Sequence, residues 1–254
     1  MHITRDGGIR WTSVTPPGVP PWSLVSLIDA SWHDGGTAYV AVDAHKLDDQ
    51  HPYIFRTHKY GAVWKDISAG IPEGSYVHAV REDPERGGLL FAGTETGVFM
   101  SFDDGEHWQR LKLNLPTTPV HDLAIKNSDL IVATHGRSFW ILDDISPLRQ
   151  FEDIHAGASA YLFKPRPAIR FRAAGQAPAS RLDFAGQTAP RGATLYYWLK
   201  DKPADKEVVS LEILDSSGAT LRKFTNQPKK EDEMCIRDRP SAFPEIPAFF
   251  ILEL

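Results

Sequence analysis

The sequence of 254 residues contains one cysteine, Cys235, and lacks the patterns that mark several classes of protein. No apolar run approaches the roughly 20 residues of a membrane-spanning helix, and no charged-then-apolar signal segment opens the chain. The formal net charge is −5 and the basic residues are scattered, which argues against nucleic acid as a partner. Because no His-x-x-x-His or Cys-x-x-Cys spacing occurs, we predict no metal site and no cofactor.

Phosphate-binding and nucleophile motifs are missing as well. The chain has no Gly-x-Gly-x-x-Gly, no P-loop and no Gly-x-Ser-x-Gly. Signals for helices are scarce. Glycine and proline, 19 of each, instead separate short runs rich in valine, isoleucine and aromatic residues. That pattern predicts an all-β chain.

A short motif occurs three times. The segments TRDGGIRW (4–11), THKYGAVW (57–64) and SFDDGEHW (101–108) fit the template Ser/Thr-x-Asp-x-Gly-x-x-Trp, although Lys59 replaces the aspartate in the second. The tryptophans are 53 and 44 residues apart, close to the length of a four-stranded propeller blade. The template positions are Thr4, Asp6, Gly8, Trp11, Thr57, Gly61, Trp64, Ser101, Asp103, Gly105 and Trp108.

The surroundings of the motif repeat too. Apolar strands are predicted at 1–3, 38–42, 53–56, 77–80, 89–93, 98–100 and 120–125, with another pair within 130–144. This divides the chain into a remnant at 1–14, fuller units at about 24–66 and 77–111, and a last unit at about 120–150. A meander of about four strands cannot bury its own faces, so neighbouring units must stack radially as in a propeller.

The template resembles the Asp-box, or BNR repeat, of sialidases, other propeller glycosidases and sortilin-type receptors. With the flanking strands, residues 1–230 are similar to bacterial sortilin-like proteins often labelled "glycosyl hydrolase, BNR repeat". The resemblance implies a β-propeller fragment at 1–150 from an exported bacterial protein, secreted or periplasmic. Met1 aligns with Val98, inside a blade, so we expect further blades upstream.

The motif is interpreted as a turn that holds a blade together. Gly105 permits a backbone geometry that a Cβ opposes, Asp103 can accept hydrogen bonds from turn N–H groups, and Trp108 can fold back over the turn. Asp104, Glu106 and His107 fall at variable positions and are expected to be solvated. A turn device must recur in every blade, whereas a catalytic site rarely occurs three times.

A second β-domain is predicted after the propeller. Residues 151–190 are interpreted as a linker with a possible first strand at 168–173, and residues 191–232 as a partial immunoglobulin-like β-sandwich. Strands are predicted at 193–201, 208–215 and 219–225, the last two joined by the turn DSSG. Inward positions are predicted for Tyr197, Leu199, Leu211, Ile213 and Leu221.

The segment EMCIRDR, 233–239, differs in character from its surroundings. Back-translated, MCIRDR matches the mosaic-end sequence of a transposase used to prepare sequencing libraries. We therefore interpret residues 233–254 as a sequencing-adapter scar followed by an unrelated tail. The alternative is a genuine basic loop.

The function that these features favour is binding or scaffolding of a protein or a glycan, without catalysis. The rival hypothesis is a glycoside hydrolase whose catalytic carboxylates lie in upstream blades, and a third is a module associated with a peptidase or with secretion. His135 and Arg137, in the polar turn THGR, are candidate ligand contacts. Trp22, Trp32 and Tyr60 are candidates for stacking on sugar rings, with core packing as the alternative for each.

Overall fold

The structure is a computed structural model in which the chain forms two compact units, Met1–Arg149 and Gln150–Leu254. Almost all of its regular structure is β-strand in small antiparallel sheets, which confirms the predicted all-β class. The residues that the structure describes are 1–154, 157–168, 193–204, 207–226 and 249–253.

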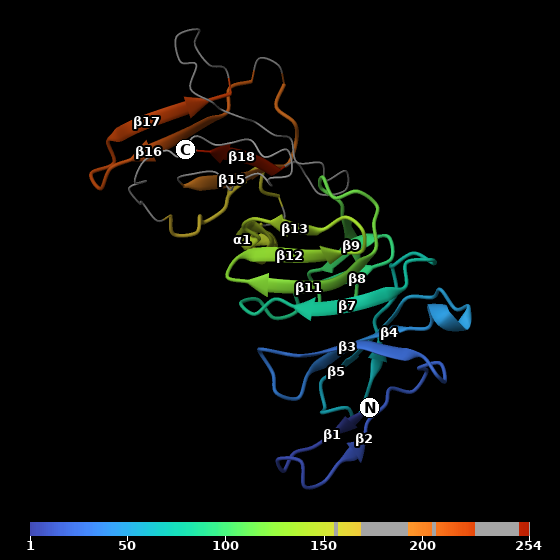
Figure 1. Cartoon of the computed structure of the whole chain (residues 1–254). Helices are drawn as coiled ribbons and strands as arrows, with labels where there is room; N and C mark the ends of the chain where they lie inside the picture. The colour runs from blue at the N-terminus through green and yellow to red at the C-terminus, as the bar shows by residue number, and fades with distance from the viewer. Residues whose placement is uncertain (155–156, 169–192, 205–206, 227–248, 254) are drawn as a thin grey trace, which may run out of the picture. The chain divides into compact units, whose positions relative to one another are not determined.

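The first unit begins with a two-stranded sheet of β1 (His2–Ile3) and β2 (Thr12–Ser13). A four-stranded antiparallel meander follows (Figure 1), in the order β3-β4-β5-β6. Its strands are β3 (Leu24–Ala30), β4 (Ala38–Asp43), β5 (Tyr53–Thr57) and β6 (Lys65–Asp66), with the 3-10 helix η1 (His45–Leu47) between β4 and β5.

The meander is then repeated along the chain. The next sheet contains β7 (Val77–Glu82), β8 (Leu90–Thr94), β9 (Gly97–Ser101) and β10 (Gln109–Leu111) in sequential order. The last sheet of the unit has three strands, β11 (Val120–Lys126), β12 (Asp129–Thr134) and β13 (Phe139–Leu142). The short helix α1 (Ser146–Arg149) ends the unit.

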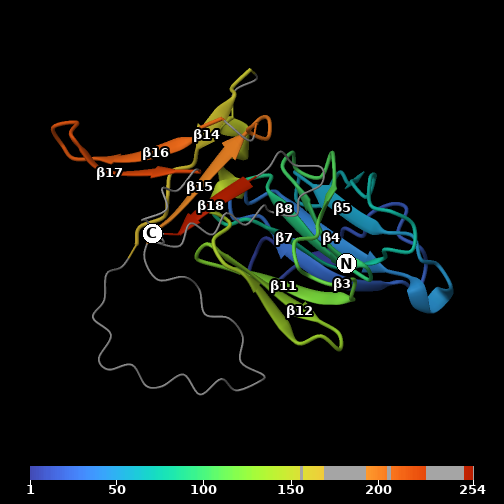
Figure 2. The same cartoon turned by 90° about the horizontal axis from the view of Figure 1, so that it is seen from above.

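Successive sheets pack face to face (Figure 1 and Figure 2). The first strand β7 packs against β3 and β4 of the preceding sheet, and β11 packs against β7 and β8. A sheet that is apolar on both faces, such as one with β8 and β9 buried throughout, gains stability only through such stacking. The largest buried cluster contains Tyr39, Ala41, Ile54, Ile67, Ile71, Val77, Val80, Leu90, Ala92, Phe99 and Trp108.

The three motif segments, here called the template turns (residues 4–11, 57–64 and 101–108), connect β1 to β2, β5 to β6 and β9 to β10. In the third turn the N–H of Gly105 donates to Ser101 Oγ at 2.9 Å, and the N–H of His107 donates to Asp103 Oδ1 at 2.9 Å. Burial of Asp103 opposes ionisation, yet its hydrogen bonds from His107 hold the pKa of the carboxyl below its usual value.

The same bonds occur in the first turn. The N–H of Gly8 donates to Thr4 Oγ1 at 2.9 Å, and the N–H of Arg10 donates to Asp6 Oδ1 at 2.8 Å. In the second turn, which has Lys59 in place of the aspartate, the N–H of Gly61 donates to Thr57 Oγ1 at 3.1 Å. The hydroxyl of the first template residue therefore organises all three turns.

Two of the three template tryptophans, Trp64 and Trp108, bind the preceding sheet rather than their own turn. Trp108 Nε1 donates to the carbonyl of Ile67 at 2.6 Å, and Trp64 Nε1 donates to the carbonyl of Val14 at 2.9 Å. Trp11 has no such partner among the described residues, donates to the carbonyl of Gly8 in its own turn, and is 60% exposed. The indole is thus a connection between consecutive sheets.

The template glycines have a second reason to be glycine. Gly105 has φ +86°, and a Cβ there would lie 2.4 Å from Ile67 Cδ1. Gly61 has φ +81°, and its Cβ would lie 2.6 Å from Val14 Cβ. Both the left-handed backbone and the close approach of the neighbouring sheet require the absence of a side chain.

The prediction that the variable positions of the third turn are solvated is wrong for Asp104, whose side chain is 28% exposed, whereas Glu106 is exposed as expected and also forms ion pairs. Asp104 accepts a hydrogen bond from the Tyr39 hydroxyl at 2.6 Å and lies 2.9 Å from Arg56 Nη1. Glu106 lies 2.6 Å from Lys65 Nζ and 3.1 Å from Arg56 Nη2. These carboxylates face the preceding sheet, whose cations compensate their charge; His107, with 89% of its side chain exposed, is solvated as expected.

In the two preceding sheets a template turn follows the third strand. In the last sheet the third strand, β13, is followed by helix α1 instead. It carries Arg149, whose guanidinium binds both carboxylate oxygens of Asp83, with Nε–Oδ1 at 3.1 Å and Nη2–Oδ2 at 2.9 Å. The side chain of Asp83 is completely buried and that of Arg149 is 9% exposed. A buried bidentate ion pair therefore joins the third sheet to the second.

The second unit contains two small sheets. One has the order β14-β15-β18, with β14 (Ala160–Leu162), β15 (Thr194–Leu199) and β18 (Phe249–Glu253). The other is the hairpin of β16 (Ser210–Leu214) and β17 (Thr220–Thr225), and the 3-10 helix η2 (Phe151–Asp153) precedes both sheets. The Asp215 carboxylate accepts the N–H groups of Ser217 and Ala219 in the hairpin turn, as its DSSG sequence indicates.

The predicted inward position of Leu221 is wrong, because its side chain is 68% exposed. The pairing changes register there: Ile213 faces Arg222, Leu214 faces Thr220, and the extra residue Leu221 leaves the alternation. The other four predicted inward residues are half-buried.

Three predictions on the C-terminal half remain open. Residues 169–173 of the strand predicted at 168–173, and residues 233–248 of the suspected adapter scar, lie outside the described residues. Residues 249–253, within the predicted unrelated tail, pair as β18 with β15. The origin of residues 233–254 and the immunoglobulin-like assignment stay predictions.

Replacing Trp108 by alanine is expected to lower the free energy of unfolding by about 3–5 kcal/mol, because a buried aromatic ring is removed from between two sheets. The matched change Trp11→Ala removes the same side chain from an exposed turn and is expected to cost less than about 1 kcal/mol. Urea unfolding of the two variants checks this; equal losses of stability would contradict the assignment of the indole to the contact between sheets.

Arg149→Ala is expected to cost about 3–5 kcal/mol, because it leaves the buried carboxylate of Asp83 without its cation. Arg10, with 90% of its side chain exposed, forms an ion pair with Asp6 on the surface. Arg10→Ala is expected to cost at most about 1 kcal/mol. Thermal unfolding of both variants compares them, and a melting temperature of Arg149→Ala equal to that of Arg10→Ala would refute a stabilising role for the buried pair.

Candidate functional site

The first strand of each successive sheet contains a β-bulge at the same place. Register shifts between Val25 and Leu27, Val77 and Ala79, and Val120 and Asp122 leave Ser26, His78 and His121 as the extra residues. A bulge turns a side chain out of the regular alternation and is frequent beside binding sites. The three bulges therefore direct equivalent side chains from adjacent strands β3, β7 and β11.

Two of these bulged residues belong to a continuous line of rings. The ring centroids of His78 and His121 are 4.4 Å apart, and those of His121 and His135 are 5.0 Å apart. On the other side, Tyr76 lies 5.1 Å from His78 and stacks on His45 at 4.7 Å with an interplanar angle of 20°. We call these five residues the histidine row.

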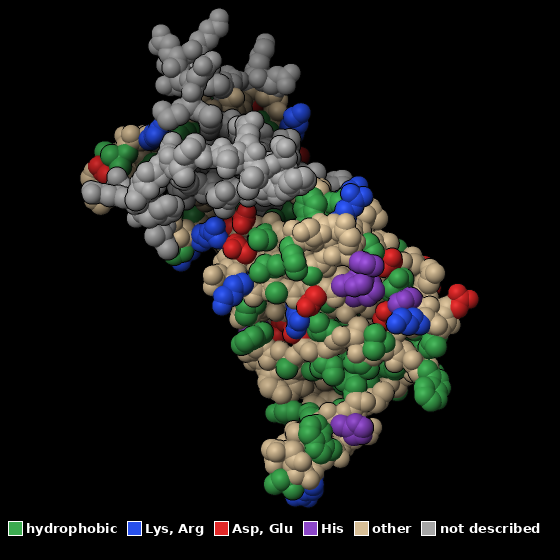
Figure 3. Space-filling model, viewed as in Figure 1, with side chains coloured by type: hydrophobic (Ala, Val, Ile, Leu, Met, Phe, Trp, Pro, Cys, Tyr) green, Lys and Arg blue, Asp and Glu red, His purple; other side chains and the backbone are tan. Residues whose placement is uncertain are grey.

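The row crosses the ends of three consecutive sheets. His45 follows β4, Tyr76 and His78 lie at the start of β7, and His121 and His135 lie at the start of β11 and the end of β12. Figure 3 shows histidine side chains gathered on the surface where β7 and β11 begin. Residues more than 80 positions apart are thus brought to one face of the first unit.

Carboxylates accompany one half of the row. Asp43 Oδ1 lies 2.6 Å from His45 Nδ1, and its Oδ2 lies 3.7 Å from His78 Nδ1. Glu95 Oε2 lies 3.3 Å from His78 Nε2. The side chain of Asp43 is 5% exposed and that of Glu95 is 33% exposed, so the first carboxylate is buried beneath the rings and the second lies at the surface.

Burial lowers the pKa of His78, and it outweighs the opposite effect of the hydrogen bond to Glu95. Burial together with a hydrogen bond to Glu95 raises the pKa of Tyr76 to about 12. At neutral pH the centre of the row is therefore an uncharged imidazole beside a protonated phenol. Such a surface offers ring faces and hydrogen-bonding groups to a ligand.

Of the two ligand contacts predicted from the sequence, His135 belongs to the row. Its N–H donates to the carbonyl of Pro119 at 2.9 Å, and Thr118 Oγ1 donates to its carbonyl at 3.4 Å, so the loop is fixed to the preceding connection. Arg137 is exposed in the same loop. Sequence reasoning did not select His78 and His121, although the repeated Val-His pairs at 77–78 and 120–121 are a signal for them.

The predicted sugar-stacking aromatic residues are exposed but lie outside the row. Trp22 and Trp32 are 94% and 73% exposed, and Tyr60 is 44% exposed. The guanidinium of Arg5 lies 4.0 Å above the ring of Tyr60, in a cation–π contact between two template turns. Because all three are exposed, the alternative prediction that they pack in the core is wrong.

Across the described ranges, no three or more His, Cys, Asp and Glu side chains are grouped so that they can hold a metal ion. Within those ranges there is also no helix with the length and apolar character needed to cross a membrane.

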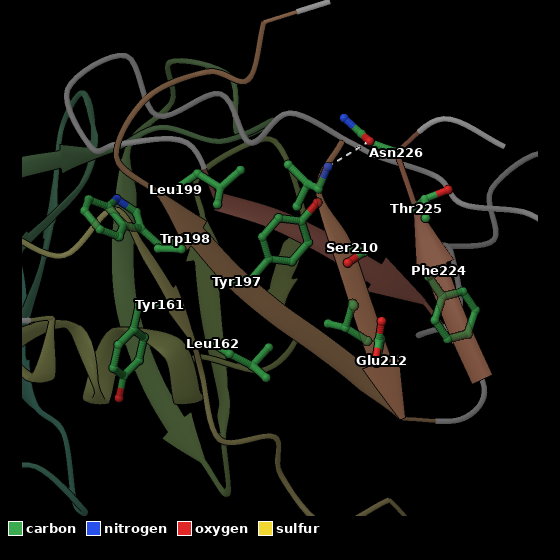
Figure 4. Close-up of a pocket in the computed structure, with 13 residues that line it drawn as sticks. Tyr161, Leu162, Tyr197, Trp198, Leu199, Ser210, Glu212, Phe224, Thr225 and Asn226 are labelled. Atoms are coloured by element: carbon green, nitrogen blue, oxygen red, sulfur yellow. Dashed lines mark hydrogen bonds between the residues drawn. The ribbon is translucent and has the colours of Figure 1, made fainter. Parts of the chain in front are cut away.

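The second unit has a hollow of about 320 Å³ between its two sheets (Figure 4). Tyr161, Tyr197 and Phe224 contribute apolar surface to it. Asn226, at its rim, accepts the N–H of Val209 at 3.0 Å and donates to the carbonyl of Glu207 at 2.9 Å. The amide of this side chain therefore joins the ends of the hairpin. The hollow is a space between two sheets, and the polar side chain at its rim is already engaged.

Comparison with known proteins gives likenesses among solved structures alone: no family model and no curated protein matches the chain. YCF48 bound to a D1 peptide matches with a TM-score of 0.42 and 16% identity, over 56% of this chain and 44% of that one. The GH74 xyloglucanase from Xanthomonas campestris matches with a TM-score of 0.39 and 17% identity, over 53% and 24%. A GH74 enzyme of Niastella koreensis matches with a TM-score of 0.39 and 13% identity, over 70% and 26%.

This chain thus spans less than half the length of each of these three structures. Every identity is below 25% and every TM-score is below 0.5. The propeller-like arrangement consequently rests on the repeated four-stranded sheets of this chain and not on the matches.

The pKa shift of His78 predicts how stability depends on pH. Because the folded chain disfavours the protonated ring, the unfolded chain takes up the proton more readily. The contribution of His78 is complete above its ordinary value of 6.5 and is lost as the pH falls from there toward the folded pKa. Urea unfolding between pH 8 and 5 is expected to show a smaller loss of stability on acidification in His78→Gln than in the parent.

His2→Gln is the control for this measurement, because His2 lies exposed in β1. It is expected to retain the pH slope of the parent. If stability depended on pH as steeply in His78→Gln as in the parent, burial of this imidazole would not contribute to the pH dependence of stability.

Proposed function

We propose that this chain is a propeller fragment that binds or scaffolds a protein or a glycan through the histidine row, without catalysing a reaction. The observation that carries the proposal is the alignment of five rings across three sheets, produced by bulges at equivalent positions. Bulges at equivalent positions in successive repeats create a surface that no single repeat possesses.

The surroundings of the row favour binding over hydrolysis. A glycosidase needs two carboxylates that face each other across the sugar, one of them available to donate a proton. Asp43 and Glu95 are both engaged by imidazoles of the row, at 2.6 Å and 3.3 Å. Their arrangement orients the rings and is typical of positioning groups.

We also propose that the chain belongs to a specific class of repeat proteins. The template turns support membership of the BNR, or Asp-box, repeat proteins of the sortilin-like type, because the hydroxyl, carboxylate and glycine of the template are each used within the turn. Location outside the cytoplasm, in the periplasm or secreted, belongs to that assignment. The scarcity of cysteine is compatible with it.

A glycan and peptide array probed with the full chain tests the binding function. The parent is expected to bind at least one class of ligand, and His121→Ala with Tyr76→Ala is expected to weaken that binding at least about tenfold, because the row loses two ring surfaces. His107→Ala, in a template turn, serves as the control and is expected to bind as the parent does. Retention of every ligand by the double variant would refute the row as the binding surface.

A further inference from the structure

We propose, building on the binding function above, that the His121–His135 end of the histidine row binds a carboxylate group of an acidic glycan, and that protonation of these imidazoles strengthens the binding. The site consists of His121, His135 and Arg137. The two ends of the row differ in charge.

At the first end, negative charge is already present. His45 and His78 have Asp43 and Glu95 as partners. Uptake of a proton there is compensated by groups of the chain itself. Protonation at this end therefore adds little net positive charge to which an anionic ligand could bind.

At the second end, the rings have no such partner. Within the described part of the chain, neither His121 nor His135 forms a hydrogen bond or an ion pair with a carboxylate through its ring. The neighbouring Asp122 binds Arg81 instead, with an Oδ1–Nη2 distance of 3.2 Å. A proton on either imidazole thus adds positive charge that an external anion can neutralise.

Two arginines lie in or contact the segments that hold these rings. Arg137 is exposed in the β12–β13 loop, two residues after His135. Arg110 Nη2 donates to the carbonyl of Thr96 at 2.6 Å and lies 3.3 Å from Thr117 Oγ1, in the connection whose Thr118 and Pro119 bond to His135. Only imidazole among these groups changes charge between pH 5 and 8, so acidification makes this end more positive.

The geometry suits one carboxylate. The two ring centroids are 5.0 Å apart, and both rings are exposed. The backbone of His135 is fixed by Pro119 and that of His121 by the bulge in β11. Two imidazolium N–H donors held in this way can bind the two oxygens of a single carboxylate by charge-assisted hydrogen bonds.

The remainder of the row favours a glycan over a peptide as the carrier of that carboxylate. Peptides are commonly bound along a free strand edge or in an apolar groove, whereas the row presents side chains at strand ends. The stacked pair of His45 and Tyr76 offers a ring surface, and the Tyr76 hydroxyl, which donates its proton to Glu95, keeps lone pairs that can accept a hydrogen bond. Ring faces combined with a few polar groups suit a sugar.

The test is isothermal titration of the full chain with tetragalacturonate and with its methyl ester, which has the same sugar skeleton without charge. Titrations at pH 5.5 and pH 8.0 use equal ionic strength, because salt screens the interaction. The acid is expected to bind about tenfold more tightly at pH 5.5 than at pH 8.0, as one charge-assisted hydrogen bond can provide. The ester is expected to bind equally at both values.

Variants locate the effect. His121→Gln with His135→Gln is expected to remove the pH dependence for tetragalacturonate, while His107→Gln is expected to retain it. Arg137→Gln is expected to weaken binding of tetragalacturonate at both pH values and to leave the affinity for its methyl ester unchanged. Thermal melts of each variant confirm that it is folded before titration.

Three outcomes would overturn the inference: equal affinities for acid and ester at pH 5.5, a pH dependence that survives in the double glutamine variant, or binding of a hexaglutamate peptide with no binding of tetragalacturonate. Binding of the acid that depends on Tyr76 but neither on pH nor on Arg137 would overturn the anion site and leave the proposed function intact. Absence of binding by every oligosaccharide and peptide tested would refute both.

Discussion

Contact between each sheet and the one before it is the constraint on which the first unit depends. The indoles of Trp108 and Trp64 reach back to the carbonyls of Ile67 and Val14, and the adjacent template glycines leave room for those same residues. A four-stranded meander with two apolar faces is unstable alone, so its turn must fit its neighbour as well as its own strands. The template is therefore selected by the interface between sheets.

Charge completes the interface that the indole begins. Asp104 and Glu106 extend from the third template turn to Arg56 and Lys65 of the preceding sheet. Where the third sheet has α1 in place of a turn, Arg149 binds the buried Asp83 of the second sheet. Apolar burial and ion pairing are thus two solutions to one requirement, the attachment of each repeat to its predecessor.

The stacked sheets also create the candidate site. Each first strand contributes one bulged residue, and these residues meet only because β3, β7 and β11 are adjacent in the stack. The distance of 4.4 Å between the rings of His78 and His121 is consequently a measure of how closely two sheets pack. The proposed binding through this row depends on the same contacts that stabilise the fold.

The sequence alone determined the strands, their division into repeats and the chemistry within each turn, because these depend on neighbours in the chain. The bond from His107 to Asp103, for example, spans four residues. Tertiary structure decided the partners of Trp108 and Trp64, 41 and 50 residues away, and that of Asp104, 65 residues away. It also decided the histidine row, because a bulge and the packing of sheets direct side chains in ways that the period of a strand does not encode.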